Sequence, residues 1–314
     1  MSDDFVTISN DSLTLVLWPG CGGRLISLQV EGTELLWRNP DYFDPDGRLV
    51  RPRSDWPPLD GSMGSWSNVG GSKTWPAPQG WSGPGEWPGP PDPVLDSGAW
   101  SVLRRDLDGA QEVVLRSPDD RRSGLRVTRS FLLPRTGRHF TQVNTFRNIA
   151  SEPVRWSIWE VCQVDTAAGG AGGELRVGVA DAAEPTVMIE AFGTVPTGTL
   201  RGGDRILPLP DVVGKLGFPD ASGTLEFARP DGASVRLEFA PEPGAEYPDG
   251  GSKVELWLQC PIEEPLAEFG GLHPRAHLVE LEVLGPLRTL APAETASLEL
   301  SWAVTPPRRC DDPE

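Results

Sequence analysis

Two glutamates in the C-terminal part of the chain are candidates for acid–base chemistry. Residues 277–282 read HLVELE, and strand alternation would put Glu280 and Glu282 on one face, with Val279 and Leu281 on the other. Charged side chains on the core side of a β-sandwich are costly unless that side lines a polar cleft. The pattern therefore indicates either a solvent-exposed face or a cleft in which carboxylates exchange protons with a ligand.

The segment 51–98 differs from the rest of the chain in composition. It is rich in Pro and Gly, shows no alternation, and contains Trp56, Trp66, Trp75, Trp81 and Trp87. Because disordered linkers are poor in aromatic residues, we expect an ordered lid or binding loop over one concave sheet face. Trp75, Trp81 and Trp87 would then stack on a ligand and Lys73 would orient its polar atoms. The alternative is a lid packed for stability alone, with Lys73 as a surface charge.

Other chemistry-bearing residues are few. The histidines are His139, His273 and His277, and His273, in a loop before Pro274, is a candidate ligand contact. Four widely spaced cysteines without a CxxC pair predict neither a zinc site nor a disulfide scaffold. Without a phosphate loop or a nucleophile elbow, we expect no metal and no cofactor. The acidic turn at 246–251 is either solvated or a cation site.

The elements that would position these residues are strands. Short runs rich in Val, Leu, Phe, Trp and Thr recur between Gly, Pro, Asp and Asn clusters, and helical periodicity is almost absent. We predict strands near 5–9, 13–18, 24–30, 34–37, 100–105, 111–117, 124–133, 139–147, 153–165, 186–191, 224–228, 234–240, 253–260, 276–284 and 296–304. This density of strands with short connections is typical of an all-β antiparallel sandwich with large sheets.

Charge and hydropathy limit the partners. The chain has 314 residues with 28 basic and 45 acidic side chains, giving a net charge of −17 and a pI of about 4.6. This balance repels phosphate backbones and anionic membrane surfaces, so we expect no nucleic-acid partner and no membrane partner. The acidic start lacks the pattern of a signal peptide and no apolar run approaches 18 residues, so we expect a cytoplasmic location. The oligomeric state stays open.

Several motifs together resemble the galactose-mutarotase-like (aldose 1-epimerase) superfamily. The opening Gly22 to Leu28, followed by GTELLW at 32–37, is similar to the start of that superfamily. The stretch GGSKTWPAPQ at 70–79 resembles an uncharacterised bacterial branch of it. Further matches are VNTFRN at 143–148, WSIWE at 156–160, residues 278–286 and residues 296–302.

This resemblance implies a β-supersandwich and a particular chemistry. Mutarotases open a hemiacetal ring with a general acid at the ring oxygen and a carboxylate base at the anomeric hydroxyl. Glu160 stands where the superfamily carries its acid histidine, and a glutamate serves as an acid only if its environment raises its pKa. The base would be Glu282, in preference to Glu280. Lys73 lies where mutarotases carry a sugar-binding arginine.

We therefore expect a single mutarotase-like β-supersandwich over residues 1–314, with 51–98 as its lid. The expected function is that of an isomerase or epimerase of mutarotase type, acting on a sugar or a sugar-like cyclic substrate. Arg24, in the N-terminal hairpin, is either a structural ion-pair partner or a ligand contact. Two other functions stay open: a non-catalytic carbohydrate-binding module, and a pocket adapted to cyclise or isomerise an intermediate of secondary metabolism.

Overall fold

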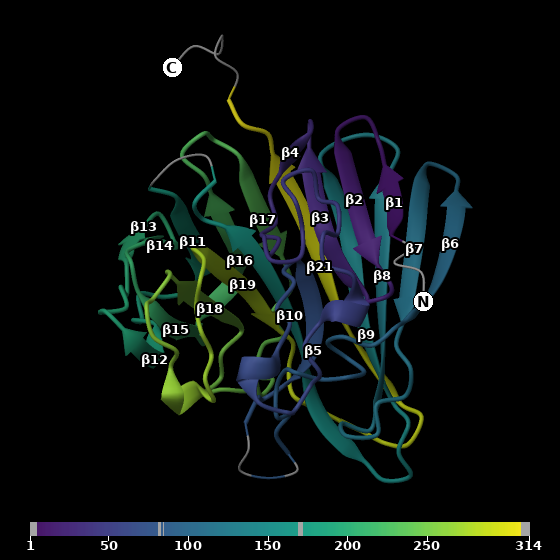
Figure 1. The fold of residues 1–314 in the computed structure, drawn as a ribbon. Coiled ribbons are helices and arrows are strands. Elements are labelled where there is room, and N and C mark those ends of the chain that lie inside the picture. Colours follow the sequence, from purple (N-terminus) through teal and green to yellow (C-terminus); the bar gives the residue numbers. More distant parts are fainter. Residues whose placement is uncertain (1–4, 81–82, 84, 169–171, 309–314) are drawn as a thin grey trace.

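The computed structural model describes residues 5–80, 83, 85–168 and 172–308, and they form two large antiparallel sheets (Figure 1). The first sheet runs β1-β2-β3-β5-β10-β19-β18-β15-β12, with β4 beside β3 and β20 beside β10. Its strands are β1 (Val6–Ser9), β2 (Leu13–Trp18), β3 (Arg24–Val30), β4 (Thr33–Glu34), β5 (Ser72–Ala77), β10 (Val154–Asp165), β12 (Thr186–Phe192), β15 (Val213–Phe218), β18 (Val254–Gln259), β19 (Leu278–Leu284) and β20 (Arg288–Leu290).

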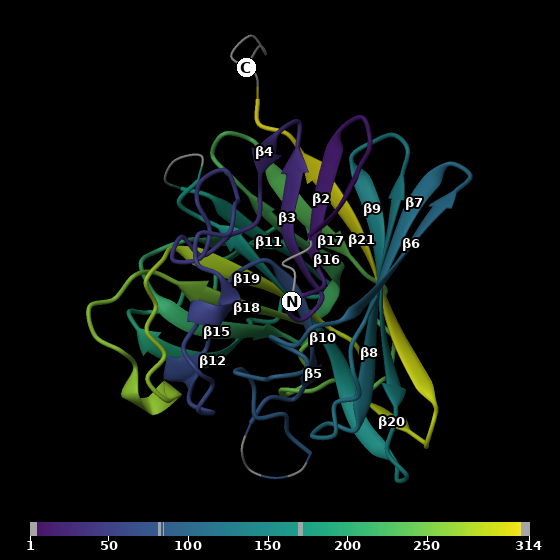
Figure 2. The ribbon, with the colours of Figure 1, turned by 45° about the vertical axis from the view of Figure 1, so that its right-hand side comes forward.

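The second sheet runs β13-β14-β11-β16-β17-β21-β9-β8-β7-β6. Its strands are β6 (Ser101–Leu107), β7 (Ala110–Arg116), β8 (Leu125–Pro134), β9 (His139–Asn148), β11 (Glu174–Val179), β13 (Thr199–Arg201), β14 (Asp204–Pro208), β16 (Ala221–Ala228), β17 (Ser234–Glu238) and β21 (Thr295–Thr305). In Figures 1 and 2, β18 and β19 of the first sheet lie in front of β11 and β16 of the second. The all-β sandwich expected from the sequence is confirmed.

The core lies between the sheets and follows the period of two along the strands. In β8 and β21, alternate residues such as Val127, Phe131, Leu300 and Trp302 are fully buried. In the described part of the chain the only helices are three 3₁₀ turns, η1 (Arg53–Asp55), η2 (Met63–Ser65) and η3 (Ala267–Phe269). Within these residues, none of the helices has the length and apolarity required to cross a membrane.

The structure corrects the expectation that 51–98 is loop throughout. Residues Ser72–Ala77 form β5, an interior strand that pairs with β10 along six residues. Pro76 is an unusual residue for such a strand because it has no N–H to donate. Since β3 pairs with β5 only between Leu25 and Ser72, Pro76 lies where that side of β5 has no paired strand. The other described residues of the segment flank β5 as irregular chain with η1 and η2.

Other strands escaped prediction because their sequences lack a strong period. β15 contains two glycines, and β11, β13, β14 and β20 are short. The strand expected at 34–37 is reduced to the two residues of β4 and a single bridge from Leu36 to Val164. Neighbouring strands supply hydrogen-bond partners that the local sequence does not reveal.

The position of β5 predicts a stability effect. Trp75 is 2% exposed and contacts the rings of Trp66, Trp87 and Trp159. We expect Trp75→Ala to lower the free energy of unfolding by about 3–5 kcal/mol, measured by urea denaturation, because the truncation leaves a cavity in the core. Trp257→Ala, on the half-buried Trp257 of β18, is the control and should cost clearly less. A Trp75→Ala protein as stable as the wild type would contradict an interior β5.

Candidate functional site

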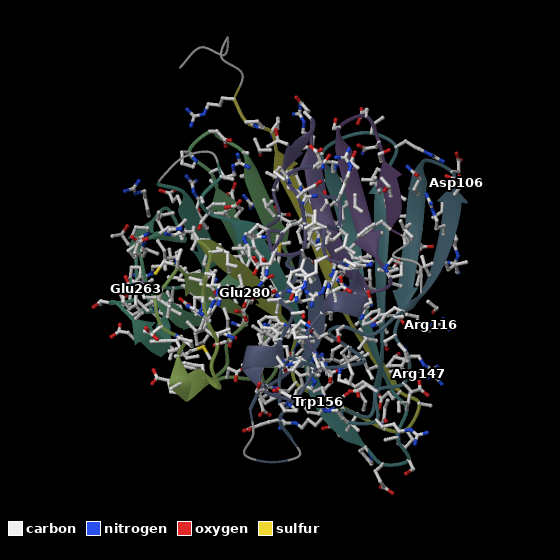
Figure 3. All side chains as sticks on the ribbon, viewed as in Figure 1. Asp106, Arg116, Arg147, Trp156, Glu263 and Glu280 are labelled. Atoms are coloured by element: carbon white, nitrogen blue, oxygen red, sulfur yellow. The ribbon has the colours of Figure 1, made fainter. Side chains whose placement is uncertain are left out.

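A cavity of about 240 Å³ opens on the face of the first sheet that is turned away from the second sheet. Its floor comes from β5, β10, β19, β18 and β15, and its rim from the segments around β5 and from the turn before β18. The lining residues are Met63, Trp66, Asn68, Trp75, Gln79, Pro90, Trp159, Gln163, Met188, Ile189, Lys215, Asp249, Trp257, Gln259, Phe269, Leu272, Glu280 and Glu282. Glu280 is labelled in Figure 3. The lining combines indole rings with carboxyl, amide and ammonium groups.

Strand register brings the charged groups of this cavity together. Glu282 on β19 lies opposite Glu255 on β18, and Lys215 comes from β15 on the far side of β18. The Lys215 Nζ atom lies 2.7 Å from Glu255 Oε2 and 3.0 Å from Glu282 Oε2. All three side chains are nearly inaccessible to solvent, and Glu282 Oε1 has no hydrogen-bond partner. One ammonium group thus neutralises part of the charge of two buried carboxyl groups.

Burial sets the protonation of this cluster. It raises the pKa of Glu282 to about 8; Lys215 opposes that shift, and the neighbouring Glu255 and Glu280 add to it. Burial also disfavours the ammonium form of Lys215, but Glu255 and Glu282 outweigh it and raise the lysine's pKa above its usual value. Asp249, on the rim, has its pKa raised to about 6 by burial and by Glu255. The raised pKa thus favours the protonated form of Glu282 at neutral pH.

Glu280 has a different environment from that of Glu282. Its Oε1 atom accepts hydrogen bonds from Lys73 Nζ at 3.1 Å and from Gln163 Nε2 at 2.7 Å. The Lys73 ammonium also lies 4.8 Å from the ring centroid of Trp75 and 5.5 Å from that of Trp66. Burial lowers the pKa of Lys73, and Glu280 partly offsets that effect. An ammonium group and an amide group thus both hold the Glu280 carboxyl group in place.

Indole rings form much of the wall around both glutamates. Trp159 on β10 donates its Nε1 hydrogen to Glu282 Oε2 at 2.6 Å, and Lys215 Nζ lies 4.6 Å from its ring centroid. Trp75 packs against it at 5.5 Å, and Trp257 on β18, which also lines the cavity, has its Nε1 3.3 Å from Gln259 Oε1. Aromatic faces of this kind stack on the apolar face of a ring-shaped ligand.

The structure places the predicted residue Glu160 away from this cavity. Alternation along β10 turns Glu160 towards the second sheet, where it is fully buried and forms an ion pair with Arg129 at 2.9 Å. Its oxygens also accept hydrogen bonds from Ser72, Thr74, Gln142 and Asn144. These donors saturate the carboxylate and connect the two sheets.

Of the other residues predicted to contact a ligand, some lie at the cavity and others lie away from it. Glu280, Glu282 and Trp75 line the cavity, and Lys73 lies directly behind Glu280. Arg24 is buried and pairs with Asp96, whose other carboxylate oxygen accepts from Trp66 Nε1.

Two more predicted residues lie outside the cavity and one lies outside the described residues. Trp87 is buried behind Trp75, with ring centroids 5.1 Å apart, and does not line the cavity. His273 lines an adjoining cavity. Trp81 falls outside the described residues.

Sequence reasoning missed Lys215, Glu255 and Trp257. The three lysines of the chain are Lys73, Lys215 and Lys253, and Lys215 lies in a glycine-containing strand without a clear period. The run 254–259, VELWLQ, lies in a predicted strand, where a period of two puts Glu255, Trp257 and Gln259 on one face. That period is the signal that would have placed Glu255 and Trp257 together on a face of their strand. Among the described residues, no group of His, Cys, Asp and Glu side chains has the arrangement to hold a metal ion.

The placement of Glu160 predicts a structural effect. Glu160→Gln removes one member of a buried ion pair and leaves the Arg129 charge uncompensated. We expect a loss of about 3–5 kcal/mol in the free energy of unfolding, measured by urea denaturation. The exposed Glu299 on β21 supplies the matched control, Glu299→Gln, which should change stability little. Unchanged stability in Glu160→Gln would contradict the structural role.

Comparison with known proteins agrees with this architecture. The chain is similar to a TPR-domain containing protein from Parabacteroides distasonis (12% identity, TM-score 0.62), covering 96% of this chain but only 47% of that one. It is also similar to a galactose mutarotase-like protein from Lactobacillus casei (13% identity, TM-score 0.57, 96% and 100% covered). A third similar structure is a putative mutarotase from Salmonella typhimurium (11% identity, TM-score 0.57, 98% and 92% covered). At these identities the similarity shows the fold alone: galactose mutarotase-like.

A search of the curated proteins gives no match. The family model that matches is described as a domain of unknown function, DUF4380, and it covers residues 4–305. The chain therefore belongs to the DUF4380 family and has a galactose mutarotase-like fold.

Proposed function

We propose that the protein is a carbohydrate isomerase of mutarotase type, which opens and recloses the hemiacetal ring of a sugar in the cavity of the first sheet. The observation that carries this proposal is the unequal pair of neighbouring glutamates. Glu282 lies beside Lys215 in a buried position that raises its pKa and favours its protonated form, whereas Glu280 is paired with Lys73 and Gln163. A general acid and a general base next to one ring-sized cavity are what hemiacetal chemistry requires.

The proposed step needs no cofactor. Glu280 takes the proton from the anomeric hydroxyl as its oxygen forms the carbonyl double bond with C1. The bond between C1 and the ring oxygen breaks, and the ring oxygen receives the proton of Glu282. The open chain then rotates about its C1–C2 bond. Glu282 takes the proton back from the former ring oxygen as this oxygen attacks C1, and Glu280 returns its proton to the carbonyl oxygen, so the ring closes in the other configuration. This assignment gives Glu282 the acid role instead of the base role expected from the sequence, and leaves Glu160 outside the reaction.

The surrounding groups support these two roles. Lys215 is shared with Glu255, so a positive charge lies next to Glu282 when its proton leaves. Trp159 donates to the same carboxyl group and fixes its position. The half-buried Trp257 offers a flat apolar surface, and Gln79 and Asn68 offer amide groups, to the face and hydroxyls of a sugar ring. The fold is shared with mutarotase-like proteins, which adds a reason to test sugars first.

The direct test measures the rate at which α and β anomers interconvert. Exchange NMR and polarimetry monitor this rate for a panel of aldoses. We expect the wild type to accelerate the exchange above the spontaneous rate, and we expect Glu282→Gln and Glu280→Gln each to lower kcat by about 10²–10⁴-fold. Glu299→Gln, on the other sheet, is the matched control and should retain full activity. Ligand binding without any acceleration would favour a carbohydrate-binding module over an isomerase.

The pH profile is a second test of the same assignment. Since Glu282 acts in its protonated form and burial raises its pKa to about 8, the fraction able to donate falls as pH rises through that value. We expect kcat, corrected for the base-catalysed spontaneous reaction, to decrease between about pH 7 and pH 9. A corrected kcat that stays level across this interval would remove Glu282 from the acid role.

A further inference from the structure

A second cavity adjoins the one just described. It has a volume of about 350 Å³ and lies beside the segment 37–42 and the loop 271–276. Its lining shares five residues with the first cavity, Met63, Trp66, Asn68, Gln259 and Leu272. The two cavities are therefore neighbours that meet along one row of side chains, and this row combines apolar groups with two amides.

The second cavity is lined by polar groups to a greater extent than the first. Asn39, Asp41, His273 and Arg275 contribute to it, together with the aromatic rings of Trp37 and Tyr42. Asp41 and Arg275 are exposed, so their charges need no compensation from the protein. Amides, a carboxylate and a guanidinium beside aromatic rings are a set of groups that recognises neutral, hydroxyl-rich molecules.

Arg275 is held in place by His273. The Nε2 atom of His273 lies 3.1 Å from the carbonyl oxygen of Ile262. Because a carbonyl only accepts, Nε2 carries the hydrogen and Nδ1 is left as an acceptor. The Nε and Nη2 atoms of Arg275 both lie 3.3 Å from that Nδ1. Both ring nitrogens of His273 are thus occupied, and the remaining N–H groups of Arg275 stay available to a ligand.

We propose that the second cavity is a subsite for a second sugar ring, so that the substrate of the protein is a reducing disaccharide or the reducing end of a longer glycan. This inference rests on the proposed function: the reducing ring lies at Glu280 and Glu282, and the next ring crosses the shared row into the second cavity. A volume of about 240 Å³ is below the range of about 300–1,000 Å³ usual for larger ligands, whereas the two adjoining cavities together fall within it.

The experiment compares paired sugars on the full chain. Exchange NMR gives kcat/KM for anomer interconversion of cellobiose, maltose and lactose and of glucose and galactose, with wild type, Arg275→Ala and Arg147→Ala. Arg147 is an exposed arginine on β9, well away from Glu280, and serves as the matched control (Figure 3). Calorimetric titration with the same sugars measures binding separately from turnover.

We expect at least one disaccharide to have a kcat/KM at least about tenfold above that of its monosaccharides. Arg275→Ala should lower this ratio by about tenfold, the effect of one lost hydrogen bond from a charged group, and Arg147→Ala should leave it unchanged. Monosaccharide turnover with no disaccharide preference, or a preference that survives in Arg275→Ala, would overturn the second subsite and leave the proposed function standing. Absence of both binding and turnover for every sugar would overturn both.

Discussion

The buried ion pair between Glu160 and Arg129 fixes the strand on which the site depends. Glu160 projects from β10 towards the second sheet, where Arg129 of β8 and the amides of Gln142 and Asn144 on β9 bind both of its oxygens. A buried carboxylate is tolerated only with such complete pairing. Since successive residues of a strand point to opposite faces, the same contacts turn Trp159 and Val161 to the outer face. The ion pair on the inner face of β10 thereby fixes which β10 side chains form the cavity floor on the outer face.

On the outer face, an imbalance of charge determines what the glutamates can do. Glu255 and Glu282 lie opposite each other on neighbouring strands, and Lys215 lies within ion-pair distance of both. Burial raises the pKa of Glu282 to about 8; Lys215 opposes this shift, and the neighbouring carboxyl groups of Glu255 and Glu280 add to it. Glu280, only two residues away, has Lys73 beside it. Two identical side chains thus have different charged partners.

The segments flanking β5 convert a flat sheet face into an enclosed site. Met63, Trp66 and Asn68 precede the strand, and Gln79 and Pro90 follow it, and all of them line the main cavity. Trp66 is anchored by Asp96, which in turn pairs with the buried Arg24. The N-terminal hairpin therefore acts on the site indirectly, by holding the wall that separates the two cavities. The same fold occurs in proteins described as mutarotase-like.

The amino-acid sequence by itself determined the fold class and most strands, because alternation of apolar and polar residues reports directly on which face of a strand is buried. It also placed Glu280 and Glu282 on one face of β19, since that needs only a period of two. The family resemblance implies an acid role for Glu160, but the sequence does not show which face of β10 looks towards the second sheet, where Arg129, 31 residues away, binds Glu160. Nor could it identify β5, whose Trp75 and Pro76 are typical of the surrounding loop until β10 pairs with the strand, or Lys215, which reaches Glu282 only across β18. Strand register and the contacts between charged groups depend on residues that are distant in the chain, so only the tertiary structure decides which residues pair.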